Sequence, residues 1–284
     1  MLLLLKLMRP KQWIKNLFVV APLVFSMTFY DSVNVIHTII AVAVFIAASS
    51  AVYVMNDICD VKADRKHPKK KHRPIASGEV SVPTAMVLLV ALVCAGIYGI
   101  RFLPINCAVI TTIYILLNIF YSFKLKHIAI LDVSLIAVGF VLRVLMGAAA
   151  ISVDVSPWII LATFLLALFL GFGKRRHEVT TPSGNKTRSS LNEYTAELLD
   201  NLINVTCAAA LMCYAIYAVD VARTTHKVEF VYTVGFVALG LFRYLHFIYV
   251  SNKGDSPENA IYQDRLFLLN LLLWLGISLR ILLP

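Results

Sequence analysis

Residues 34–55 read NVIHTIIAVAVFIAASSAVYVM, and they lead without a break into NDICDVKADR at 56–65. The first stretch is long and apolar enough to cross a bilayer as a helix, because a crossing needs about 20 apolar residues. The second stretch places three aspartates at the end of that helix. An apolar span that ends in acidic residues predicts a membrane protein with polar chemistry at one membrane surface.

The rest of the chain continues this pattern. Of its 284 residues, 60% are apolar and only 15% are charged, whereas a soluble domain carries about 25% charged residues. The composition excludes soluble, disordered and coiled-coil proteins, and continuously apolar runs argue against a β-barrel. We predict one all-α membrane domain, residues 1–284, built as a bundle of nine transmembrane helices near 14–30, 34–55, 83–102, 105–122, 128–151, 156–173, 196–220, 229–250 and 264–283.

Basic residues alternate sharply between the connections. Twenty of the 26 Lys and Arg residues fall before the first span or in every second connection, in 6–15, 62–73, 124–126, 174–188 and 253–265. Cytoplasmic loops of membrane proteins carry an excess of Lys and Arg. We therefore expect a multi-pass protein of the plasma membrane, with its N-terminus and these connections in the cytoplasm and, after nine crossings, its C-terminus outside.

Asp57, Asp60 and Asp64 are spaced i, i+3 and i+7, which stacks three carboxylates on one helical face. Their mutual repulsion predicts a cation among them. Oxygen ligands suit Mg2+, which is usually shared with substrate phosphates, and Asn56 adds an amide oxygen. The alternative is a solvated helix end whose acids pair with Lys62, Arg65 and Lys66.

A basic segment, HPKKKHRPIASG at 67–78, follows the acids. The preference for positive charge in the cytoplasm explains part of it. It does not explain acids and bases interleaved in one loop, with Arg73 fixed between His72 and Pro74. Metal-binding carboxylates beside cations are what phosphorylated substrates require.

NDICDVKADR resembles the first aspartate-rich motif, N-D-x-x-D-x-x-x-D, of the UbiA superfamily of intramembrane prenyltransferases. Nearly the whole chain also resembles one branch, the polyprenyl-phosphate (decaprenyl-phosphate) phosphoribosyltransferases. The matching segments are RPKQWIKN at 9–16, residues 56–78, YSFKLK at 121–126, LDV at 131–133 with GFVLR at 139–143, and GKRRHE at 173–178.

Two departures from ordinary UbiA prenyltransferases bear on the substrate. Those enzymes typically carry a second D-x-x-x-D motif after span six, where this chain has KRRHE at 174–178, and Y-x-x-x-K after span four, where position 125 is Leu between Lys124 and Lys126. Cations therefore replace carboxylates. Two phosphorylated substrates would repel each other in a site of low dielectric unless cations lie between them, so the exchange favours a phosphoribosyl donor.

The resemblance implies Mg2+-dependent transfer of 5-phosphoribose from phosphoribosyl diphosphate to a polyprenyl phosphate, in cell-envelope precursor synthesis at a bacterial inner membrane. We expect Asp57, Asp60 and Asp64 to be catalytic, and with Asn56 to bind the metal ion. The polyprenyl phosphate is anionic at neutral pH, so its attack needs no general base. The substrate-binding candidates are Lys15, Asn56, Arg65, Lys71, Arg73, Tyr121, Lys126, Arg143, Lys174, Arg175 and Glu178.

Several candidates have structural alternatives. Lys15 is at a membrane boundary, where Lys is often an anchor, and Tyr121 with Lys126 could be a solvated interfacial end. Arg143 lies midway along a span, where it is costly unless paired or facing a cavity; a pair with Asp132 is the structural alternative. For Arg243 we expect a structural or interfacial role.

Two rival functions remain open. One is prenyl transfer to an aromatic or other acceptor, against which KRRHE and the missing second acidic motif argue. The other is a non-catalytic carrier of a phosphorylated lipid, which should show broken helices in matched halves with polar groups at the midplane. The expected partners are the two substrates and the bilayer, without nucleic acid and with a homo-oligomer left open.

Overall fold

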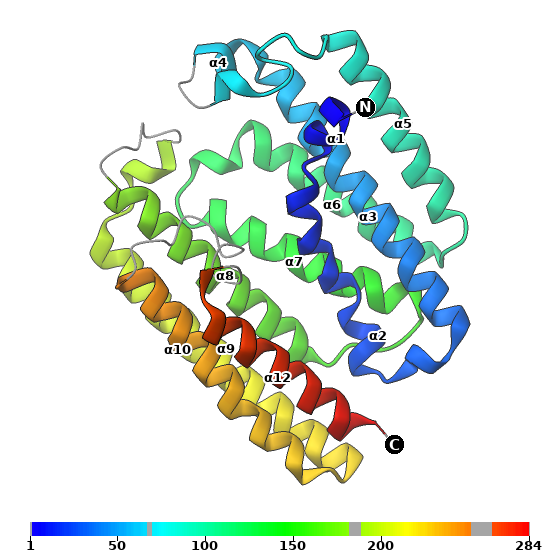
Figure 1. Cartoon of the computed structure of the whole chain (residues 1–284), viewed down its shortest axis with the longest axis vertical. Helices are drawn as coiled ribbons and strands as arrows, with labels where there is room; N and C mark the ends of the chain where they lie inside the picture. The colour runs from blue at the N-terminus through cyan, green and yellow to red at the C-terminus, as the bar shows by residue number, and fades with distance from the viewer. Residues whose placement is uncertain (1, 67–69, 182–188, 251–262, 284) are drawn as a thin grey trace. The chain divides into compact units, whose positions relative to one another are not determined.

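A computed structural model of the chain describes residues 2–66, 70–181, 189–250 and 263–283 (Figure 1). Within these ranges all regular structure is helical. Eight helices are long and apolar enough to cross a membrane. They are α3 (Ser32–Cys59), α5 (Val82–Ile100), α6 (Ile105–Phe123), α7 (Leu131–Ala150), α8 (Pro157–Thr180), α9 (Ala196–Thr225), η6 with α10 (Val228–Tyr232 and Thr233–Tyr249) and α12 (Arg265–Leu282).

Short side-chain caps set the start of several of these helices. Asp31 accepts a hydrogen bond from the backbone N–H of Val33 at the start of α3, and Ser81 accepts one from Thr84 at the start of α5. Such caps satisfy amide groups that have no partner inside the helix. They explain why the expected spans near 34–55 and 83–102 begin within two residues of the observed helices.

The ninth expected span, near 14–30, is not one helix in the structure. It is divided into η1 (Pro10–Val19), α2 (Ala21–Phe25) and η2 (Thr28–Tyr30). Pro22 lies in the first turn of α2, and Met27 takes a left-handed backbone at φ 56° where α2 ends. A proline and a left-handed residue both interrupt an α-helix, so the expected count of nine continuous spans is not confirmed.

The chain forms two compact units. The first comprises Met1–Phe123 and Leu142–Asp154, and the second Lys124–Val141 and Val155–Pro284, so that the residues of α7 are divided between them. In the first unit α5 packs along α3 (Figure 1). Its core includes Leu7 of α1 (Leu2–Met8), Val54 of α3 and Ile75, each at most 1% exposed.

Close backbone approach shapes the first unit at Gly147 of α7. A Cβ atom at this position would lie 2.0 Å from the carbonyl oxygen of Val19. At Gly99 of α5, it would lie 2.7 Å from Cγ2 of Val44 on α3. Both positions therefore require glycine for these segments to pack at their observed separation.

In the second unit α8 and α9 form the most extensive helix pair, and α10 runs along α12 (Figure 1). The core contains Phe169 and Phe172 of α8, Leu199 and Ile203 of α9, and Phe247 of α10, each at most 4% exposed. The expected span near 156–173 ends too early, because α8 continues to Thr180. The KRRHE sequence is therefore on the last turns of a helix and not in a loop. At this end of a helix the dipole stabilises cations.

Candidate active site

The acidic cluster is built from the end of one helix and the start of the next. Asp57 is in the last turn of α3, Asp60 is the residue that ends α3, and Asp64 lies in α4 (Val61–Lys66). The N–H of Asp64 donates to the carbonyl of Asp60 at 2.8 Å, so the chain nearly continues the helical path. Asp57 is 4% exposed and Asp64 is 2% exposed, while Asp60 is half-buried.

Arg73 holds two of these carboxylates together. Its Nη1 atom donates to Oδ1 of Asp57 at 3.0 Å and to Oδ2 of Asp64 at 2.7 Å. A second arginine, Arg9, donates to the same oxygen of Asp57 at 2.7 Å, and Lys70 Nζ is 3.9 Å from Asp64. These contacts lower the cost of burying two like charges.

The cations differ from those expected of a solvated helix end. Of the three proposed partners, Lys62 and Lys66 are exposed, and Arg65 directs its Nε to the carbonyl of Ala76 at 3.3 Å. The cations that contact the acids come from other segments: Arg9 precedes η1, Lys70 begins η3 (Lys70–His72) and Arg73 follows it. The acids therefore pair with cations outside the helix end on which they lie.

The donor set fits a hard divalent ion. Oxygens of Asp57 and Asp64 converge on one nitrogen of Arg73, so these two oxygens lie close together. Among the described residues, no three Asp, Glu, His or Cys side chains gather closely enough to hold a metal ion, and Asp60 does not join the pair. Mg2+ is commonly held by one or two carboxylates together with substrate phosphates and water, and a pair of aspartates matches that mode.

The other candidates of the first unit are more dispersed. Lys15 is half-buried on η1, Asn56 is half-buried beside Asp57, and Tyr121 is half-buried near the end of α6. Lys71 is exposed on η3. The assignment of these four residues to substrate binding remains a prediction. His67 and Lys69 lie outside the described residues, as do Lys186, Arg188 and Lys253 of the basic connections.

Arg143 is enclosed within the first unit. It is 6% exposed, its Nε donates to Oδ1 of Asn16 at 2.9 Å, and its Nη2 donates to the hydroxyl of Tyr114 at 3.1 Å. The guanidinium carbon is 5.0 Å from the centre of the Tyr114 ring and 5.9 Å from that of Phe45. The structural alternative named Asp132 as its partner, but Asp132 contacts other residues.

In the second unit, the end of α8 carries a buried ion pair. Arg175, 3% exposed, has its Nε 2.8 Å from Oδ2 of the fully buried Asp132, and its Nη1 donates to Glu178. Arg176 donates to Asp200 and lies over the ring of Tyr249, with its guanidinium carbon 4.4 Å from the ring centre. Arg175 is therefore engaged by carboxylates of the protein.

Lys126 and Lys174 complete the candidates of the second unit. Lys126 is in η4 (Leu125–His127) and Lys174 on α8, and both are half-buried. Arg243, expected to be structural, pairs with Asp264 at 2.7 Å, where Asp264 also caps α12 through the N–H groups of Leu266 and Phe267. This pair agrees with the structural role expected for Arg243.

Sequence reasoning did not assign a role to two residues that hold the charged clusters. Arg9 contacts Asp57 and lies over the ring of Tyr53, with its guanidinium carbon 4.7 Å from the ring centre. Tyr194 donates a hydrogen bond to Asp132 at 2.7 Å. The signal for Arg9 was its place in the RPKQWIKN segment, whereas no sequence pattern marked Tyr194.

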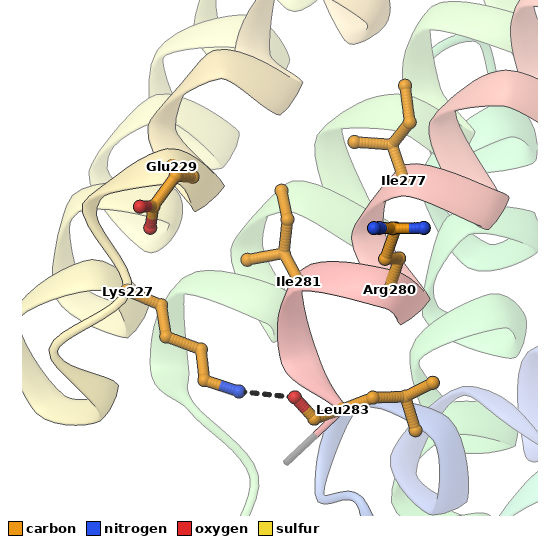
Figure 2. A pocket seen from close by; sticks show the side chains of 6 residues that line it. All are labelled: Lys227, Glu229, Ile277, Arg280, Ile281 and Leu283. Atoms are coloured by element: carbon orange, nitrogen blue, oxygen red, sulfur yellow. Dashed lines mark hydrogen bonds between the residues drawn. The ribbon is translucent and has the colours of Figure 1, made fainter.

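A pocket elsewhere in the second unit contains none of the predicted site residues (Figure 2). Its volume is about 560 Å3, and it lies where α12 ends beside η6. Lys227 donates from Nζ to the carbonyls of Leu282 and Leu283, at 3.0 and 2.6 Å, so its ammonium group closes the end of α12. Arg280 and Glu229 also line this pocket.

The model of the UbiA prenyltransferase family matches residues 17–272 of this chain. The chain belongs to the UbiA prenyltransferase family. As a member of this family with eight apolar spans, it is a multi-pass integral membrane protein and a transferase.

Its similarity to two relatives extends over almost the entire chain. A decaprenyl-phosphate phosphoribosyltransferase of Mycolicibacterium smegmatis is 34% identical over 287 residues, which covers 96% of this chain and 90% of that protein. The decaprenyl-phosphate phosphoribosyltransferase of Corynebacterium glutamicum is 32% identical over 280 residues, covering 95% of this chain and 84% of that protein.

Solved UbiA structures share the fold. A UbiA homolog from Archaeoglobus fulgidus bound to DMAPP and Mg2+ superposes with a TM-score of 0.75 at 17% identity, covering 98% of each chain. A UbiA homolog from Aeropyrum pernix K1 gives a TM-score of 0.67 at 14% identity, covering 96% of this chain and 98% of the other. At these identities the likeness establishes the helical architecture of the family.

Proposed function

We propose that this protein transfers 5-phosphoribose from phosphoribosyl diphosphate to a polyprenyl phosphate such as decaprenyl phosphate, releasing diphosphate. The observation that carries the proposal is identity of 31–34%, over about 95% of the chain, to relatives named decaprenyl-phosphate phosphoribosyltransferase. The enzyme class that follows is a glycosyltransferase, specifically a pentosyltransferase. Its product would serve cell-envelope precursor synthesis at a bacterial inner membrane.

The charge at the end of α8 supports a phosphoribosyl donor. Ordinary UbiA prenyltransferases typically carry a second acidic motif at this point, where this chain has Lys174, Arg175 and Arg176. Phosphoribosyl diphosphate and a polyprenyl phosphate together bring more negative charge than a prenyl diphosphate and a neutral acceptor. Added cations reduce the repulsion between two such substrates in a site of low dielectric.

In this proposal Asp57 and Asp64 hold Mg2+, with Asn56 as a further oxygen ligand, while Asp60 stays outside the pair. When bound, the ion neutralises charge that develops on the departing diphosphate. Arg73 and Arg9 neutralise the two buried aspartates and keep their oxygens directed to one point. Arg73 and Lys71 are placed in the same segment, from which we propose that they contact donor phosphates.

The proposed reaction requires little proton transfer. An oxygen of the acceptor phosphate, already anionic at neutral pH, attacks C1 of the ribose as the bond from C1 to diphosphate breaks. Because no proton must be removed from the nucleophile, a general base is unnecessary. Positioning and electrostatic stabilisation of an oxocarbenium-like transition state should then supply most of the rate.

The remaining candidates have proposed roles within their own units. In the first unit, Lys15, Arg65 and Tyr121 are proposed to contact substrate. Arg143 is proposed to shape the site from within the protein, since its guanidinium donates to Asn16 and Tyr114. In the second unit, Lys126, Lys174 and Glu178 are proposed to contact donor or acceptor, with Glu178 accepting a hydrogen bond from the ribose.

The proposed orientation follows the basic residues. The N-terminus and the acidic cluster face the cytoplasm, in keeping with the excess of Lys and Arg on that side. We propose that residues 10–30 make a further crossing as a broken helix, which places the C-terminus outside. Broken helices occur at membrane depth where other parts of the protein enclose them, and the buried Asn16 and Val19 agree with such enclosure.

Prenyl transfer is the second candidate. Family membership favours it, as does the fold shared with a UbiA homolog whose solved structure contains DMAPP and Mg2+. The two candidates are separated by giving purified protein labelled phosphoribosyl diphosphate or a labelled prenyl diphosphate, each with Mg2+ and polyprenyl phosphate. Label from the ribose donor in extracted lipid supports phosphoribosyl transfer. Turnover of the prenyl donor alone would reject it.

A further inference from the structure

A buried network of polar contacts in the second unit begins at Tyr194. Its hydroxyl accepts a hydrogen bond from the N–H of Ile130 at 2.6 Å and donates one to Oδ1 of Asp132 at 2.7 Å. Tyr194 is 4% exposed and Asp132 is fully buried. Burial and the hydrogen bond to Asp132 raise the pKa of the Tyr194 phenol, so the hydroxyl stays protonated and remains a donor at neutral pH.

The network of contacts continues from Asp132 to the end of α8. The other oxygen of Asp132 forms an ion pair with Nε of Arg175, and Nη1 of Arg175 donates to Glu178. The Nε contact is close but not aligned as a hydrogen bond. The side chain of Glu178 is 29% exposed, in contrast to the buried side chains that precede it in the network. Tyr194 is thereby linked to an accessible carboxylate.

The segment that carries Tyr194 also holds the turn before α7 at a second point. The hydroxyl of Ser190, in η5 (Ser189–Asn192), donates to the carbonyl of Lys126 at 3.1 Å. Ile130 closes this turn with φ 69°, a left-handed conformation that β-branched residues rarely adopt. Two hydrogen bonds from 190–194 thus fix a turn of unusual backbone geometry on which Lys126 lies.

We propose that Tyr194 is a positioning residue that places Lys126 and Glu178 for a diphosphate-bearing donor. The inference rests on the proposed function, because it takes these two residues as substrate contacts. Arg175 then acts through Glu178 and does not itself touch the substrate. Strained backbone is a feature of preorganised sites, and this network of hydrogen bonds and a buried ion pair connects two segments that the sequence assigns to substrate binding.

The test compares Tyr194→Phe with Tyr214→Phe in the purified full-length protein. The Tyr214 hydroxyl is also buried and bonded, to Thr233 at 2.9 Å and to Trp274 at 2.8 Å, but among residues outside the network. Y194F should raise the donor KM about tenfold or lower kcat/KM to the same extent, whereas Y214F should change neither by more than about twofold. Melting temperatures of both variants are measured alongside.

Two further variants keep the result interpretable. Ser190→Ala removes only the bond to Lys126, and it should raise the donor KM about threefold while the protein remains folded. In a Glu178→Gln background, Y194F should have less effect than it has alone, since the two substitutions affect the same network of contacts. Unchanged kinetics in Y194F and S190A, or an equal kinetic loss in Y214F, would overturn the proposal.

Failure of the proposed function can be recognised separately. Wild-type protein that transfers no phosphoribosyl group but turns over a prenyl diphosphate would refute phosphoribosyl transfer. The same four variants are then compared with the prenyl donor, whose diphosphate presents the same chemistry to the site. That comparison then tests the positioning role of Tyr194.

Discussion

Nη1 of Arg73 donates a hydrogen bond of 2.7 Å to Oδ2 of Asp64, nine positions earlier in the chain. The same nitrogen also contacts Asp57, so one guanidinium group spans two buried carboxylates. Mutual repulsion between these acids would otherwise oppose their burial. The arrangement keeps two carboxylate oxygens close together and partly neutralised, as the proposed site for a divalent ion and diphosphate requires.

Arg73→Lys should weaken the enzyme although it preserves the charge. A lysine ammonium is a point charge on a flexible stem and does not reproduce the planar guanidinium that contacts both aspartates. We expect kcat/KM for the donor to fall at least about tenfold. Arg101→Lys, at the exposed end of α5, is the matched control and should retain wild-type kinetics. Equal activity in R73K would show that the bridge is unimportant.

Removal of the divalent ion should abolish transfer. Chelation is expected to stop lipid labelling, and added Mg2+ to restore it, because the ion offsets the charge of the leaving diphosphate. Asp64→Asn should lower kcat at least about 100-fold, as a neutral amide is a poorer ligand for a hard cation. Asp31→Asn is the control, since Asn caps α3 about as well as Asp. Activity that survives both chelation and D64N would contradict the metal assignment.

Gly147→Ala should destabilise the protein. The new Cβ would meet the carbonyl oxygen of Val19 at 2.0 Å, and a backbone atom cannot move aside alone. Overpacking of this kind costs about 1–3 kcal/mol, so the melting temperature in detergent should fall. Gly235→Ala on α10 meets nothing within 4 Å and should be neutral or slightly stabilising. A wild-type melting temperature for G147A would show that η1 and α7 pack less closely than described.

The Arg243–Asp264 pair should make stability depend on pH. Desolvation raises the pKa of Asp264, but hydrogen bonds from Arg243 and the N–H groups of α12 outweigh it and hold the pKa below its ordinary value. The pair therefore stabilises the protein above the unfolded pKa, and that contribution is lost as pH falls through the lower folded pKa. Because the pair is partly exposed, we expect about 1 kcal/mol.

The check for this pair is the melting temperature of wild type against Asp264→Asn across pH. The variant keeps an N-cap side chain and loses the ion pair. Wild type should be the more stable protein at about pH 6, and the difference should shrink as the pH falls below the ordinary Asp pKa of about 3.9. A difference that grows in acid would mean that the folded pKa of Asp264 is raised and not lowered.

Local patterns predicted much of this architecture. Eight apolar runs correspond to eight observed helices, because hydrophobicity over about 20 residues is a strong signal for a span. The run at 14–30 is divided into three short helices and is not one continuous helix, since average hydropathy does not register a proline at position 22 or the left-handed backbone of Met27. The end of α8 was placed too early because charged residues mark the end of a span, although here Arg175 is buried and paired and the helix continues past it.

The site was predicted less completely than the fold. The spacing of Asp57 and Asp64 and the nearness of Arg73 are local, and the structure joins these three. Contacts between distant residues were not readable, such as Arg9 with Asp57 or Asn16 with Arg143. Nearly every face of these helices is apolar, so periodicity does not reveal which face meets which neighbour, and the role of Tyr194 emerges only from three-dimensional contacts.

The most direct test of the central claim is the mass of the lipid product. Purified protein is incubated with phosphoribosyl diphosphate, a polyprenyl phosphate and Mg2+, and the extracted lipid and released diphosphate are quantified together. Phosphoribosyl transfer predicts a polyprenyl phosphate heavier by one 5-phosphoribosyl group, formed in equal amount to the diphosphate released. Unchanged lipid mass, alongside diphosphate release from a prenyl donor under the same conditions, would contradict it.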